Sequence, residues 1–123
     1  AIIKALVAQY SLPIEIIPCE IVREPDGLAM SSRNVRLLPE QRKHAVSISQ
    51  ALFSVKSQEK SVEETKKSVV NAIKSVPLLL LEYFEIVDGT TLQPITQWSE
   101  SENPVGCIAV HVGTVRLIDV IMF

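Results

Sequence analysis

The sequence is short of cysteine, glycine and aromatic residues, and the shortage of cysteine excludes two classes of protein. Its 123 residues include two Cys and four Gly, and aromatic side chains make up 5%. Cys19 and Cys107 are too few for a disulfide framework and do not have the spacing of metal ligands. Because both lie in apolar runs, where a free Cys packs as a small hydrophobe, we predict buried, reduced thiols.

The chain also lacks long hydrophobic runs and an excess of charge of one sign. Its longest apolar candidate, Leu78 to Leu81, is far shorter than the ~20 residues of a membrane-spanning helix. The formal net charge of -2 gives no general attraction to nucleic acid or to anionic membranes. The pattern of a signal peptide is absent from the first residues. We therefore expect a cytoplasmic protein with no nucleic-acid partner and no membrane partner.

The first residues form an apolar pattern that fits one face of a helix. The chain begins with Ala1 rather than Met, and a helix that starts without a cap suggests that a preceding segment has been removed. We predict a helix over residues 1–11 and a strand over residues 14–22, where Pro18 favours an edge strand or an interruption. A helix followed by one strand is half of a βαβ unit and needs a sheet to join.

The rest of the chain predicts helices first and strands afterwards. Pro39 suits the first turn of a helix. Ser61 and Glu64 form the capping box of a second helix. Three β-rich runs follow, over residues 81–87, 105–112 and 115–122, and a glycine-containing turn joins the last two. This order indicates an α+β fold, a small antiparallel sheet of about three strands with two helices on one face.

The segment Asp26 to Asn34 (DGLAMSSRN) carries the groups that could do chemistry. Ser31, Ser32 and Arg33 follow a glycine turn, and they offer hydroxyls, backbone N–H groups and a guanidinium, which are the groups that hold phosphate oxygens. Arg23 and Arg36 flank the segment and add positive potential. Taken alone, a Ser-Ser-Arg tripeptide is more typical of a solvated surface loop. The chain has no GxxxxGK[ST] loop and no GxGxxG motif.

Three runs resemble the pantothenate synthetase (pantoate–beta-alanine ligase) family. VREPDGLAMSSRNVRLLPEQR resembles the signature at the junction of the family's two domains. VGTVRLIDVI resembles its closing strand, and a weaker likeness continues through EYFEIVDGTTLQPI, so the resemblance covers essentially the whole chain. It implies that residues 1–22 end a Rossmann-like nucleotide-binding domain and that residues 23–123 form the C-terminal lid domain.

The resemblance implies an ATP-dependent ligase that joins pantoate to beta-alanine. ATP and pantoate first give pantoyl adenylate and pyrophosphate with the help of magnesium, and the amine of beta-alanine then displaces AMP to give pantothenate. ATP is a substrate here, so no tightly bound cofactor and no metal ligand are expected in this chain. Without the first domain, we expect the chain to be inactive.

The resemblance also assigns roles to residues. The main chain of Val22 and Met30 would contact adenine. Ser31, Ser32 and Arg33 would act as the catalytic, phosphate-binding part of a KMSKS-like loop, neutralising charge on the departing pyrophosphate. The turn at Gly27 would let this loop swing between open and closed positions.

Three features depart from the family pattern. Leu38 stands before Pro39, where the family has Asp or Thr, so we expect a weaker helix start. Val120 stands where the family has Asn, which puts any contact of that Asn in doubt. The HIGH-like histidines and the lysine-bearing segment of the family do not occur in this chain.

Two other hypotheses assign the chain to different functional classes. A free-standing interaction module would keep the fold and self-associate as a homodimer joined through residues 1–22, because unpaired strand edges and uncovered apolar faces favour association. A small anion-binding domain with an unrelated partner is the third reading.

Overall fold

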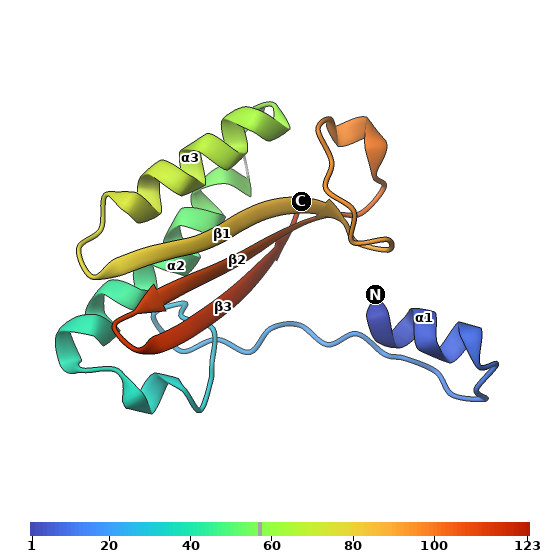
Figure 1. The fold of residues 1–123 in the computed structure, drawn as a ribbon, viewed down its shortest axis with the longest axis horizontal. Coiled ribbons are helices and arrows are strands. Elements are labelled where there is room, and N and C mark those ends of the chain that lie inside the picture. The colour runs from blue at the N-terminus through green and yellow to red at the C-terminus, as the bar shows by residue number, and fades with distance from the viewer. Residues whose placement is uncertain (57) are drawn as a thin grey trace.

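The computed structural model describes residues 1–56 and 58–123, which form a two-layer body and an extended N-terminal arm (Figure 1). The elements are α1 (Ile2–Gln9), η1 (Asn34–Arg36), α2 (Pro39–Lys56), α3 (Val62–Lys74), β1 (Leu79–Asp88), η2 (Trp98–Glu100), β2 (Pro104–Val112) and β3 (Val115–Met122). Helices α2 and α3 lie on one face of the sheet, as Figure 1 shows. The predicted α+β class, with three antiparallel strands and two helices on one face, is confirmed.

Helix α2 begins at Pro39, as predicted, and it has a partial cap. The side chain of Gln41 accepts a hydrogen bond from the backbone N–H of Leu38 at 3.0 Å. This is the returning half of a capping box, in which the third helical residue satisfies the donor of the capping residue. Gln41 therefore satisfies the N–H of Leu38, while Leu38 has no side-chain acceptor for the N–H groups of the first helical turn.

Helix α3 begins with the capping box that the sequence predicts. The backbone N–H of Glu64 donates to the Ser61 hydroxyl at 3.2 Å, and the Glu64 carboxylate accepts from the Ser61 N–H at 3.0 Å. The helix ends at Lys74, before Pro77. Leu78 then adopts a φ of 68°, and this left-handed residue turns the chain into β1.

The sheet has the order β1-β2-β3, and all of its strand pairs are antiparallel. The tight turn between β2 and β3 contains Gly113 at a φ of 61°, a conformation that glycine adopts without steric cost. A bulge in β1 between Leu81 and Tyr83 leaves Glu82 outside the regular register with β2. Bulges bend a strand and redirect the extra side chain.

The hydrophobic core lies between the helix pair and the sheet. Its members from the helices include Ile48, Leu52, Val69 and Ile73, and those from the strands include Phe84, Ile86, Ile108, Val110, Leu117 and Ile121. No helix among the described residues covers the opposite face of the sheet (Figure 1). Its exposed apolar side chains are Leu80, Tyr83, Ile118 and Met122. No helix in residues 1–56 or 58–123 is long and apolar enough to cross a membrane.

The N-terminal arm differs from two of our predictions. Residues 14–22 form no strand, because a strand needs a neighbour to complete its hydrogen bonds and, among the described residues, only Val22 at the end of the run is paired, with Met30. The prediction of a buried Cys19 is wrong, since Cys19 is exposed on the arm, and Cys107 is only partly buried. The predicted helix does form as α1, with no buried residue.

Candidate functional site

The segment that precedes the Ser-Ser-Arg loop is a tight turn. Gly27 donates its N–H to the carbonyl of Glu24 at 2.8 Å, and the N–H of Glu24 donates to the carbonyl of Leu28 at 2.8 Å. Pro25 sets the φ of the turn, and Gly27 accepts a φ of 91°, as in a type I turn followed by a left-handed residue. The turn thus fixes the direction in which the chain enters the Ser-Ser-Arg loop.

Asp26 ties this turn to helix α2. Its carboxylate accepts from the guanidinium of Arg42 at 2.8 Å and from the backbone N–H of Leu28 at 3.3 Å. The hydrogen bond from Arg42 lowers the pKa of Asp26. Both side chains are partly exposed, so the ion pair contributes little to stability, but it does link the turn to the helix.

Residues 30–33 form a short loop, and hydrogen bonds fasten it at both ends. At its start, the N–H of Met30 donates to the carbonyl of Val22 at 2.9 Å. At its end, the side-chain amide of Asn34 donates to the carbonyl of Ala29 at 3.1 Å. Within the loop, the N–H of Arg33 donates to the hydroxyl of Ser31 at 3.2 Å. The loop therefore protrudes from two fixed points.

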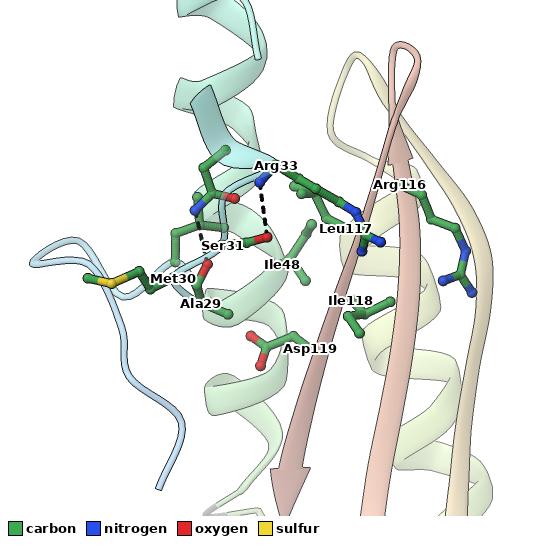
Figure 2. Close-up of a pocket in the computed structure, with 11 residues that line it drawn as sticks. Ala29, Met30, Ser31, Arg33, Ile48, Arg116, Leu117, Ile118 and Asp119 are labelled. Atoms are coloured by element: carbon green, nitrogen blue, oxygen red, sulfur yellow. Dashed lines mark hydrogen bonds between the residues drawn. The ribbon is translucent and has the colours of Figure 1, made fainter. Parts of the chain in front are cut away.

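A cavity of about 190 Å³ lies between this loop and β3. The residues that line it are Leu28, Ala29, Met30, Ser31, Arg33, Asn34, Ile48, Arg116, Leu117, Ile118 and Asp119. Figure 2 shows the side chain of Arg33 reaching from the loop toward β3 and that of Met30 pointing away from it. The amide oxygen of Asn34 is buried and has no hydrogen-bond partner within the described part of the chain.

The structure brings together most of the predicted site residues. Met30, Ser31 and Arg33 line the cavity, while Ser32 is exposed outside its lining. Val22 is also outside the lining and is joined to Met30 by the main-chain bond. In residues 1–56 and 58–123, no group of His, Cys, Asp and Glu side chains could hold a metal ion.

The sequence gives no sign of the ion pair that holds this site to the sheet. The guanidinium of Arg23 donates two hydrogen bonds to the carboxylate of Asp119, at 2.7 and 2.9 Å. The side chains are 19% and 2% exposed, so the carboxylate is removed from water. Removing one partner of such a buried pair typically costs about 3–5 kcal/mol of stability. The two residues are 96 positions apart, which hides their relationship from pattern analysis.

Among the described residues, some of the arginines near the site form ion pairs with carboxylates, and Arg33 does not. Arg23, Arg42 and Arg116 each form an ion pair with a carboxylate, that of Asp119, Asp26 and Glu82 respectively. The flanking charge expected from Arg23 is therefore compensated by Asp119. Arg33 forms no ion pair with any residue that the structure describes, so its guanidinium is available to an anion at the rim of the cavity.

Comparisons with known proteins give a consistent result. The sequence model of a family described as pantoate-beta-alanine ligase matches residues 1–122. The chain is 52% identical to the pantothenate synthetase of Bacteroides fragilis, over all of this chain and 44% of that protein. It is 54% identical to the pantothenate synthetase of Phocaeicola vulgatus, over all of this chain and 45% of that protein.

Solved structures show the same likeness. The pantothenate synthetase of Thermus thermophilus matches 97% of this chain with a TM-score of 0.88 and 36% identity, over 44% of its own chain. The pantoate-beta-alanine ligase of Francisella tularensis, complexed with beta-gamma ATP and beta-alanine, matches 98% of this chain with a TM-score of 0.63 and 25% identity, over 38% of its own chain. The chain thus spans less than half the length of the relatives it matches.

Proposed function

We propose that this chain, which belongs to the pantoate-beta-alanine ligase family, supplies the lid domain of an enzyme that joins pantoate to beta-alanine with consumption of ATP. Residues 23–123 would be the lid, and residues 1–22 the end of the nucleotide-binding domain before it. The observation that carries the proposal is the unpaired guanidinium of Arg33, which lines the same cavity as the hydroxyl-bearing Ser31. The beta-gamma ATP and beta-alanine complexed with the Francisella tularensis relative support it.

The loop would act in the first of two steps. A carboxylate oxygen of pantoate attacks the α-phosphorus of ATP, the bond to the β-phosphate breaks, and pantoyl adenylate and pyrophosphate form. Ser31, Ser32 and Arg33 would bind the β- and γ-phosphates and neutralise the charge that grows on them as pyrophosphate leaves. The exposed position of Ser32 and Arg33 leaves both side chains accessible to such a ligand.

The second step forms the product without further ATP. The amine of beta-alanine attacks the carbonyl carbon of the adenylate, an amide bond forms, the amine loses a proton and AMP leaves. Adenine would lie against the main chain at Val22 and Met30, which the bond between them already holds together. Magnesium would assist the first step by balancing phosphate charge, but the side chains of the described residues do not fit a metal site, so we assign no metal ligand to this chain.

The loop alone is too small a binding site to hold ATP tightly. Three or four hydrogen bonds to phosphate contribute about 0.5–3 kcal/mol each, the upper end when a charge is involved. Association costs an estimated ~4–15 kcal/mol in lost freedom of motion. The net affinity of the 123-residue chain for ATP is therefore expected in the millimolar range or weaker, and the chain by itself is expected to form no pantothenate.

An ATP titration followed by backbone amide NMR tests the proposal on the chain itself. We expect shifts confined to Val22 and to residues 30–33 at millimolar ATP, with Arg33→Ala abolishing them. Arg36→Ala is the matched control, because Arg36 is also exposed and without an ion pair in the described residues. ATP-dependent shifts that survive Arg33→Ala, or that are centred on another surface, would contradict the proposal.

A second candidate function is self-association through the arm and the uncovered sheet face. Helix α1 buries none of its residues, and the apolar Ile2, Ile3 and Ile17 are 75%, 63% and 73% exposed. Apolar surface of this kind favours contact with another protein surface. A homodimer by light scattering that becomes a monomer in Ile3→Asp would support this function, whereas a monomer at high concentration would exclude it.

A further inference from the structure

We propose that Arg23 and Asp119 are positioning residues for the phosphate loop, residues 30–33, a role that rests on the nucleotide-binding function proposed for that loop. Neither residue is expected to contact ATP. Their ion pair would fix where the loop stands relative to β3, and it would cancel a negative charge at the wall of the cavity that the phosphates approach.

Arg23 makes contacts with three different parts of the molecule. Its guanidinium donates two bonds to Asp119 on β3 and a third, at 3.0 Å, to the carbonyl of Gly27 in the turn. It also lies over the ring of Phe53 on α2, 4.8 Å from the ring centre. The planar guanidinium can make these contacts together, while the single ammonium of lysine cannot reproduce the two-point contact.

The position of Arg23 is passed on to the loop through the backbone. Arg23 pairs with Ala29 in an isolated antiparallel bridge, and the neighbouring Val22 carbonyl accepts from the N–H of Met30. Asn34 closes the far end of the loop by donating to the carbonyl of Ala29. A shift of Arg23 would therefore move Ala29, and with it both ends of the loop.

The charge of Asp119 gives the pair a second effect. Asp119 lines the same cavity as Ser31 and Arg33, and its side chain is 2% exposed. A bare carboxylate at this place would repel a polyphosphate, because like charges are poorly screened when they are partly buried. The two bonds from Arg23 compensate this charge and leave Arg33 as the uncompensated cation at the rim of the cavity.

A paired replacement separates positioning from stability. Arg23→Met combined with Asp119→Val removes both charges at once, and apolar replacement of a whole buried pair is often neutral for stability. The matched control is Lys66→Met combined with Glu85→Val, which removes an ion pair between α3 and β1. Arg23→Lys is the conservative variant, since it keeps a charge beside Asp119 but loses the two-point contact.

The measurements use the 123-residue chain for NMR and the complete protein that carries it for kinetics. For the Arg23/Asp119 variant we expect an unchanged urea midpoint, altered amide shifts at residues 30–33 without ATP, and a fall of about 100-fold in kcat/KM for ATP, as for a misplaced catalytic group. The KM for beta-alanine should stay at its wild-type value. The Lys66/Glu85 variant should keep the wild-type loop shifts and ATP kinetics.

Two results would overturn the positioning role. The first is that the Arg23/Asp119 variant folds and shows wild-type loop shifts and the same kcat/KM for ATP as the Lys66/Glu85 control. The second applies if that variant does not fold: Arg23→Lys then shows unchanged loop shifts and unchanged ATP kinetics. A wild-type protein without ligase activity would refute the proposed function, and the loop shifts measured without ATP would still decide the positioning role.

Discussion

The indole nitrogen of Trp98 donates a hydrogen bond to the backbone carbonyl of Lys60 at 2.7 Å. This bond joins the loop between β1 and β2 to the segment that leads into α3. The Trp98 ring also packs against Phe123, with 5.0 Å between the ring centres. One side chain thus ties the helix layer to the end of the chain.

Trp98→Phe tests the contribution of that bond. The replacement keeps an aromatic ring near Phe123 but removes the donor, so we expect the free energy of unfolding to fall by about 1 kcal/mol from the lost hydrogen bond. Urea denaturation of the two proteins measures the difference. Trp98→Ala should cost more, because it also removes the ring contact, and equal stability of all three proteins would show that this contact is unimportant.

The capping box of α3 predicts a loss of helix stability in Ser61→Ala. The Ser61 hydroxyl accepts from the backbone N–H of Glu64, and replacing such a cap by Ala typically costs about 1 kcal/mol. Thermal denaturation followed by circular dichroism measures the change. Ser47→Ala is the control, because Ser47 lies inside α2, where Ala is the better helix former; an equal loss in both variants would contradict the role of the cap.

Asp88 predicts a pH dependence of stability in the acid range. The hydroxyl of Ser101 and the backbone N–H of Thr91 donate to its carboxylate at 2.6 and 2.7 Å, and they lower the pKa of Asp88 from 3.8 to about 2. A carboxyl whose pKa is lower in the folded state stabilises the protein above its unfolded pKa and loses that effect as pH falls through the folded value. The contribution is therefore complete above about pH 4 and lost toward about pH 2.

Asp88→Asn isolates this effect from that of the other acidic residues. The variant should be less stable than the wild type at neutral pH, and the difference should shrink as the pH falls from about 4 to about 2. Urea denaturation at several pH values in this window measures it. A difference that stays constant with pH would show that Asp88 does not titrate with a lowered pKa.

The elements that could be predicted from the sequence are those whose signals are local. The β-rich run after the glycine turn placed β3 at Val115–Met122, and the Ser61 to Glu64 spacing placed the start of α3. The strand expected over residues 14–22 did not form, because β-branched residues show a preference for strands but cannot provide the neighbouring strand that completes one. Local patterns are therefore sufficient for capped helices and hairpins and insufficient for an unpaired strand.

The candidate site likewise has a part that local sequence predicts and a part that depends on tertiary contacts. Met30, Ser31 and Arg33 are neighbours in the sequence, so a motif locates them together, and the structure places all three on one cavity. The pair of Arg23 and Asp119 joins positions 96 residues apart, and only the packing of the turn against β3 brings them into contact. Tertiary contacts likewise decide which arginine near the site is left without an ion pair among the described residues.

The unpaired guanidinium of Arg33 gives the most specific prediction for activity. In the complete protein that carries this chain, Arg33→Ala should lower kcat for the proposed ATP-dependent first step by about 10²–10³-fold, the usual effect of removing one group that stabilises charge in a transition state. Arg36→Ala removes the same charge three residues further along the chain and should keep the wild-type kcat. Release of pyrophosphate in single-turnover experiments with ATP and pantoate measures the step directly, before beta-alanine is added. Equal activity of the two variants would show that general positive charge is sufficient there, and that Arg33 does not bind the departing phosphates.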